Sequence, residues 1–156
     1  MSMSSIVPAI QAELKADATV LSLVGTSDNI PFILQCSPQG LIEGTESGAV
    51  VIAIKGSWRS GSPLHPERFP KIEIEVWMDP VRDASGVATE SFPEVTGRAL
   101  DLWEAVDNLL HRNDGEDVMF GTLKIGGSDR LVEPTFIEVP DGTGLVIGKA
   151  LYGLTF

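Results

Sequence analysis

The most regular hydrophobic pattern in the chain is a strict alternation from Lys71 to Met78. Successive side chains of a strand point to opposite faces, so this alternation predicts a sheet strand with one buried face and one wet face. The apolar positions are Ile72, Ile74, Val76 and Met78, and the opposite positions are Lys71, Glu73, Glu75 and Trp77. The strand therefore predicts a sheet that is covered on one side.

A helix is predicted over residues 91–112, after a short loop that follows this strand. Ser91 and Glu94 have the spacing of a reciprocal capping box, in which each residue caps the other. Apolar residues then recur at steps of four and three, as one face of a helix requires: Val95, Ala99, Leu102, Val106 and Leu109. Strand and helix together predict a sheet with a helix on one side, and what covers its other side becomes the functional question.

The N-terminal residues 6–24 also repeat with a helical period, because Ile6, Ile10 and Leu14 are four residues apart. Ser4 or Ser5 is the expected helix cap. Asp17 is expected to begin a short second helix that ends before Gly25.

Strands account for most of the remaining apolar runs. A short strand is predicted at 32–35, and residues 49–54 are apolar on both faces and β-branched, which indicates a central strand. Three further strands are predicted at 118–125, 131–138 and 145–156, with turns at 126–129 and 141–142; Pro134 indicates an edge or a bulge. The expected fold is α+β, a single domain over residues 1–156 whose mostly antiparallel sheet has two main helices packed on one face.

A loop is predicted at 56–70, between the central strands, because this segment contains three prolines and two glycines. Loops of that length inside a compact domain are uncommon and are often functional. Trp58, Arg59, Arg68 and Phe69 are residue types that anchor protein interfaces, and Trp77 on the polar face of its strand is a further candidate.

Composition and charge narrow the classes of function. The chain has 156 residues, of which 43% are hydrophobic and 21% charged, and its net charge is −11. This acidity argues against a surface that holds nucleic acid, because phosphate binding needs clustered Lys and Arg. A single cysteine, Cys36, is expected to be a buried apolar residue rather than a nucleophile. The sequence contains neither a signal peptide nor a membrane span, so we expect a cytosolic protein with no membrane partner.

The search for catalytic chemistry yields little. The two histidines are His65, in the proline-rich segment, and His111, which is expected to be a helix C-terminal residue. The acidic residues after His111 lack the spacing of a calcium loop. The segment 144–150 resembles a phosphate loop but lacks its spacing and its hydroxyl residue. We therefore expect no catalytic residue, no metal and no cofactor.

The N-terminal segment from Ala9 to Gly25 resembles the start of tail terminator (tail completion) proteins of long-tailed bacteriophages. It contains Leu14-Lys15-Ala16-Asp17 and ends in Val24-Gly25. The order of the remaining segments is similar too: a segment around Pro31, a β-rich middle with Ile74-Glu75-Val76-Trp77, a helix rich in Leu and Ala, and C-terminal strands. The proline-rich segment 56–70 matches no pattern of that family.

The resemblance implies an α/β structural protein of the virion, assembled in the host cytoplasm into a homo-oligomeric, six-membered ring. The ring would cap the tail tube protein, stop tube polymerisation and offer a docking face to the head connector. DNA would pass through the ring, and Glu73 and Glu75 could line its lumen and repel phosphates. Three alternatives remain. The protein could be another neck protein, for head completion or tail-to-head joining. It could also be a small hydrolase that uses His65 or His111, or a monomeric adaptor.

Overall fold

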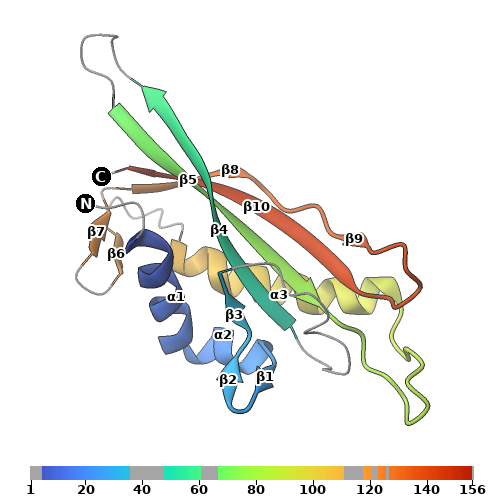
Figure 1. The fold of residues 1–156 in the computed structure, drawn as a ribbon. Coiled ribbons are helices and arrows are strands. Elements are labelled where there is room, and N and C mark those ends of the chain that lie inside the picture. Colours follow the sequence, from blue (N-terminus) through green and yellow to red (C-terminus); the bar gives the residue numbers. More distant parts are fainter. Residues whose placement is uncertain are drawn as a thin grey trace.

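The computed structural model describes residues 5–35, 48–60, 67–110, 118–120, 123–125 and 127–155. These residues form an α+β fold with a mostly antiparallel sheet, as predicted, and the helices lie on one side of that sheet (Figure 1). The order of strands in the main sheet is β3–β4–β5–β10–β8, and β9 pairs with the beginning of β10.

Three helices and three long strands make up most of the described structure. The helices are α1 (Ile6–Ala16), α2 (Ala18–Leu23) and α3 (Phe92–Leu110). The long strands are β4 (Gly48–Ser60), β5 (Glu67–Met78) and β10 (Val146–Thr155). The short strands are β1 (Thr26–Ser27), β2 (Ile30–Pro31), β3 (Ile33–Leu34), β6 (Val118–Phe120), β7 (Leu123–Ile125), β8 (Gly127–Val132) and β9 (Ile137–Glu138).

The N-terminal helices form where the period predicts them. Ile6, Ile10 and Leu14 are fully buried on one face of α1. Ser5 occupies the N-cap position of α1, and Asp17 caps α2 because its Oδ1 accepts a hydrogen bond of 2.9 Å from the backbone N–H of Val20. The prediction of a second short helix beginning at Asp17 is confirmed.

The capping and packing of α3 follow the sequence closely. The backbone N–H of Ser91 donates 2.8 Å to Oε2 of Glu94, which is the Glu94 half of the predicted capping box. The buried face of α3 consists of Val95, Ala99, Leu102, Trp103, Val106 and Leu110. The predicted stripe ended at Leu109, which is only partly buried, and Leu110 takes the core position instead.

The core lies between the helices and one face of the sheet. On β5 this face consists of Ile72, Ile74, Val76 and Met78, all buried as the alternation predicts. Opposite them in register lie alternate residues of β4 and β10, including Val50, Ile52, Ala150 and Tyr152. Contacts from α3 reach β5 and β10, whereas α1 contacts β3 and β4, so the helices share the cover of this face.

The predicted loop at 56–70 is wrong for most of its length. Residues 56–60 continue β4 and residues 67–70 begin β5, and the two runs pair from Gly56↔Lys71 to Ser60↔Glu67. A register shift between Ile54 and Gly56 precedes this pairing. We call residues 56–60 and 67–70 the β4–β5 arm; it projects beyond the rest of the sheet (Figure 1).

The C-terminal strands also differ from the prediction. The predicted strand 118–125 is a hairpin of β6 and β7, and the expected turn at 126–129 lies largely within β8. The predicted strand 131–138 is interrupted: β8 ends at Val132 and β9 begins at Ile137, with Pro134 between them. The turn at 141–142 is confirmed, and Gly142 has a φ of +82° there.

Candidate assembly surface

The sheet face that points away from the helices is the candidate surface. Its central rows follow from the strand register: Trp77 lies opposite Ala49 and Ile147, Glu75 opposite Val51 and Lys149, and Glu73 opposite Ala53 and Leu151. Apolar residues therefore gather at the Met78 end of β5, and charged residues occupy the middle of the face.

Trp77 is half-buried at the apolar end. It packs with Phe32, Ala49 and Leu145 in a small cluster that is separate from the main core. Its indole Nε1 donates a hydrogen bond of 3.0 Å to Oε2 of Glu75. The tryptophan is thus held by packing on one side and by a carboxylate on the other, which fixes its orientation on this face.

Both glutamates of this face form ion pairs with lysines. Lys149 Nζ lies 3.2 Å from Oε1 of Glu75, and Lys55 Nζ lies 3.3 Å from Oε1 of Glu73. Glu75 is only 8% exposed, so the face is less wet than the alternation predicted. A carboxylate buried to this degree needs such partners. That Glu73 and Glu75 line the lumen of a ring stays a prediction, because it concerns how subunits are arranged.

The other four interface candidates lie in the β4–β5 arm. The register places Trp58 directly opposite Phe69 and Arg59 directly opposite Arg68. The structure therefore brings together residues that were predicted as parts of one loop. Trp77 lies at the other end of β5, eight residues from Phe69 along the strand.

A groove between β8, β9 and β10 was missed by the sequence reasoning. It has a volume of about 340 Å³ and is lined by Val132, Glu133, Thr135, Ile137, Ile147 and Lys149. Ile137 is 60% exposed and Val132 51% exposed. The only sequence signal for it was Pro134, which interrupts the predicted strand where the groove lies.

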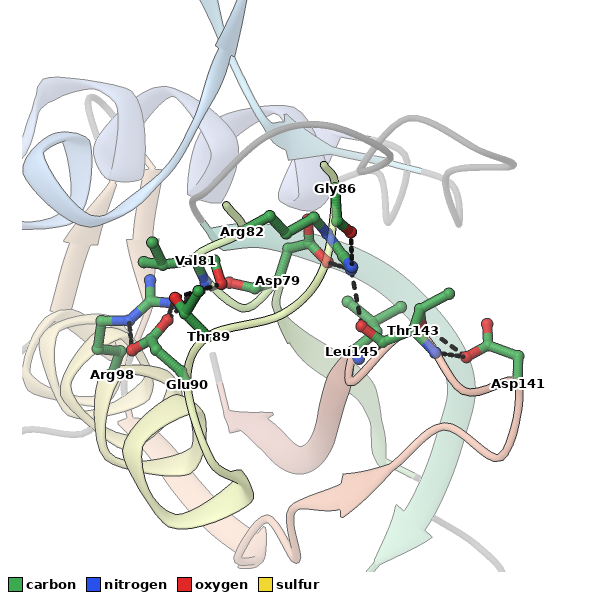
Figure 2. A network of polar contacts seen from close by, with 10 residues as sticks. All are labelled: Asp79, Val81, Arg82, Gly86, Thr89, Glu90, Arg98, Asp141, Thr143 and Leu145. Atoms are coloured by element: carbon green, nitrogen blue, oxygen red, sulfur yellow. Dashed lines mark hydrogen bonds and ion pairs between the residues drawn. The ribbon is translucent and has the colours of Figure 1, made fainter. Parts of the chain in front are cut away.

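A polar network supports the turn-rich segment between β5 and α3 (Figure 2). Arg82 Nη2 donates 2.9 Å to Oδ1 of Asp79 and 2.7 Å to the carbonyl oxygen of Thr143, so Arg82 ties this segment to the turn before β10. Burial raises the pKa of Asp79 above its usual value, although Arg82 and Arg98 oppose the shift. In the turn itself, hydrogen bonds from Thr143 lower the pKa of Asp141.

Arg98 fastens the same segment to α3. Its guanidinium binds the carboxylate of Glu90 and donates 2.8 Å to the carbonyl oxygen of Asp79 (Figure 2). Oε1 of Glu90 also accepts 2.6 Å from the backbone N–H of Val81. The hydrogen bond from Arg98 is the main reason that the pKa of Glu90 is lowered. These contacts brace the Met78 end of the candidate surface, so we assign them a structural role.

The residues considered for catalysis or for binding a metal fall outside the described ranges: Cys36, His65, His111, Asp114, Glu116 and Asp117. Within the described ranges, no group of three or more His, Cys, Asp or Glu side chains could hold a metal ion. The segment that resembles a phosphate loop lies mostly in the strand β10. Among the helices that the structure describes, none has the length and apolarity needed to cross a membrane.

Comparison with known proteins leaves the family open and defines the fold. No model of a known protein family matches the sequence, and no curated protein matches it. Among solved structures, the chain is similar to a chain in the structure described as "Virion of native gene transfer agent (GTA) particle". The two share 16% sequence identity with a TM-score of 0.59 over 96% of this chain and 92% of that one. At this identity the likeness shows a shared fold over nearly the whole length of both chains.

Proposed function

We propose that this chain is a structural protein of a phage-like virion that forms a ring at the head-proximal end of the tail tube. In this role it stops polymerisation of the tube and provides the docking face for the head connector. The observation that carries the proposal is the shared fold with a chain of a virion particle, which extends over 96% of this protein. The resemblance of residues 9–25 to tail terminator proteins supports the finer role.

The surface of the subunit supports a role in assembly. A two-stranded ribbon beyond a sheet and an exposed apolar groove are features of a protein that contacts neighbours. Ring subunits need a head-to-tail interface, which joins two different surfaces of the same chain. The arm and the groove are two such surfaces.

The acidity of the chain suits a conduit for DNA. A net charge of −11 disfavours retention of phosphates, so DNA can pass such a ring without binding it. Each of these two glutamates forms an ion pair with one lysine, Lys55 with Glu73 and Lys149 with Glu75, and this pairing offsets their negative charge. A lumen lined by this face would thus be weakly charged rather than strongly acidic.

Electron microscopy of particles produced without this protein tests the proposal. Tails of uncontrolled length that are detached from heads are expected for a terminator. Tails of normal length that fail to join heads would instead indicate a tail-to-head joining neck protein, which is the second candidate. Normal, fully joined particles would contradict both.

A histidine double variant tests the alternative that the protein is a small hydrolase. Replacement of both His65 and His111 by alanine should leave particle assembly intact if the protein is structural. Loss of a measurable hydrolytic turnover in this variant would favour a small hydrolase instead.

A further inference from the structure

The β1–β2 hairpin presents an isoleucine to solvent. The pair of its ladder nearest the turn is Ser27↔Ile30, and the turn itself consists of Asp28 and Asn29. These two residues have φ values of 51° and 64°, the sign that a type I′ turn requires at both central positions. Ile30 is 62% exposed although it belongs to this ordered hairpin. The hairpin thus holds an apolar side chain where another surface can bury it.

Hydrogen bonds and packing fasten the base of the hairpin to one lateral edge of the main sheet. The backbone N–H of Gly25 donates 2.8 Å to the carbonyl oxygen of Gly48, and the N–H of Phe32 donates 2.8 Å to the carbonyl oxygen of Gly25. Phe32 is buried against Ala49, and the chain continues from it into β3, which ends the strand order of the main sheet on this side. Ile30 is therefore positioned at the β3 edge.

The groove between β8, β9 and β10 lies along the opposite lateral edge. It extends from Ile137, opposite Ile147, to Val132, opposite Leu151. Ile137 is 60% exposed and Val132 is 51% exposed. Four strand spacings separate β3 from β8, which is roughly 19 Å at about 4.8 Å per spacing. Figure 1 shows β9 and the β1–β2 hairpin on opposite sides of β5, so a chain cannot place its own hairpin in its own groove.

The charges of the hairpin and the groove are complementary. Asp28 is the charged residue of the hairpin; it is exposed, and within the described ranges it forms no ion pair with a basic side chain. Lys149 lines the groove, and its side chain is 59% exposed although its Nζ lies 3.2 Å from Glu75. An ammonium group has three donors, so it can bind a second carboxylate. The other charged residue of the lining, Glu133, already pairs with Arg130 at 3.1 Å.

We propose that the β1–β2 hairpin of one subunit docks into the β8–β9–β10 groove of a second copy of this chain. Ile30 packs against Ile137 and Val132. Asp28 approaches the ammonium group of Lys149, while the β4–β5 arm takes no part. The contact joins two different edges, so each bound subunit keeps one hairpin and one groove free for the next. The closure of this series into a ring rests on the proposed function; the pairwise contact does not.

Cross-linking between two single-cysteine variants tests the contact. In a Cys36→Ser background, one chain carries Thr26→Cys in the hairpin and a second, mass-tagged chain carries Thr135→Cys in the groove; both threonines are exposed. The matched control for the second chain is Asn108→Cys, at an exposed position of α3 on the other side of the sheet. At high micromolar concentration, a short bismaleimide should join hairpin to groove several-fold more than hairpin to control. Equal yields would overturn the proposal.

A matched pair of apolar-to-acidic changes tests the role of Ile30. Ile30→Asp in the hairpin chain should lower the yield of cross-linked product several-fold. Val87→Asp is the control, because Val87 is 60% exposed and lies in the turn-rich segment between β5 and α3. It adds the same charge and should leave the yield unchanged. Urea unfolding establishes that both variants are folded. An equal effect of the two changes, or no effect of Ile30→Asp, would contradict the contact.

A second matched pair tests the charge of the hairpin. Asp28→Asn keeps a residue that tolerates positive φ, and it should lower the yield about two-fold, as the loss of an exposed ion pair predicts. Asp101→Asn, at an exposed position of α3, reduces the net negative charge by the same amount and should not lower the yield. Equal yields from these two variants would contradict the approach of Asp28 to Lys149.

A chain that carries both Thr26→Cys and Thr135→Cys distinguishes the contact from the ring. A head-to-tail contact should give cross-linked products larger than a dimer, whereas a product that stops at dimers would contradict it. The virion role is judged separately, from particles that lack the protein. Hairpin-to-groove cross-linking together with normal particles would refute only the proposed function. If particles without the protein have aberrant tails, and the Ile30→Asp variant restores normal tails, only the contact would be refuted.

Discussion

The indole Nε1 of Trp77 donates a 3.0 Å hydrogen bond to Oε2 of Glu75, two residues earlier on the same face of β5. Lys149, from the adjacent strand β10, contacts the other oxygen of this carboxylate at 3.2 Å. The three side chains form a small polar unit on the sheet face without helices. Because Glu75 is buried, this hydrogen bond and this ion pair contribute to the stability of the sheet within a single chain.

Replacement of Trp77 by phenylalanine should lower the free energy of unfolding by about 1–2 kcal/mol. The variant removes the donor to a buried carboxylate and keeps most of the aromatic packing. Urea unfolding measures the change. In a double-mutant cycle with Glu75→Gln, the coupling energy should be about 1 kcal/mol, and no measurable coupling would contradict the contribution of this hydrogen bond.

The buried carboxylate of Asp79 should give stability a specific pH dependence. Its pKa is raised in the folded state, so the folded protein binds more protons than the unfolded chain above the ordinary aspartate pKa of 3.8. The stabilisation from protonated Asp79 is complete below that value and is lost as pH rises through the folded pKa. The free energy of unfolding of the wild type, minus that of Asp79→Asn, should therefore fall as pH is raised from 3.8 towards neutrality.

Glu90→Gln serves as the control with the opposite sign. The pKa of Glu90 is lowered by Arg98, so its contribution is present above the ordinary glutamate pKa of 4.5 and is lost as pH falls through the folded pKa. The difference between wild type and Glu90→Gln should shrink in acid. Two difference curves with the same slope would contradict the assigned directions of the pKa shifts.

The parts of the fold that depend on local patterns could be read from the sequence. Ile72 to Met78 alternate because β5 is buried on one face there, and the cap of α2 by Asp17 needs only residues three positions away. Leu110 replaces Leu109 in the core because the apolar arc of α3 includes Trp103 and drifts around the helix. Periodicity alone cannot decide which of two adjacent leucines at the end of a helix is buried.

The β4–β5 arm could not be predicted, because its strands are defined by pairing between segments and not by composition. Pro70 suggests a loop, yet it lies opposite Ser57, just beyond Lys71, where the pairing of β5 with β10 ends. A proline without a backbone N–H is tolerated at such an edge. The groove could not be predicted either, because the break between β8 and β9 is set by the residues of β10 with which each of them pairs.

The hydroxyl group of Tyr152 donates 2.6 Å to Oδ1 of Asp107 and connects β10 to α3. Burial raises the pKa of Tyr152 well above its ordinary value, and the hydrogen bond to Asp107 adds to this shift. Tyr152→Phe should therefore cost about 1.5–3 kcal/mol of unfolding free energy, because the acceptor is charged. Arg130 still pairs with Asp107 at 2.6 Å in this variant, so the loss should stay below that of Asp107→Ala. Chemical denaturation of both variants makes the comparison.

The last prediction concerns Gly148 on β10, which leaves room for the ring of Phe136. A Cβ at this position would lie 2.5 Å from two ring carbons of Phe136, so Gly148→Ala should destabilise the protein by about 1–3 kcal/mol. Gly97→Ala is the matched control: a Cβ added there would meet no atom within 4 Å, and the change within α3 should stabilise the protein by about 0.5–1 kcal/mol. Chemical denaturation of both variants tests this pair of effects, and Phe136→Ala combined with Gly148→Ala should give a loss smaller than the sum of the single changes.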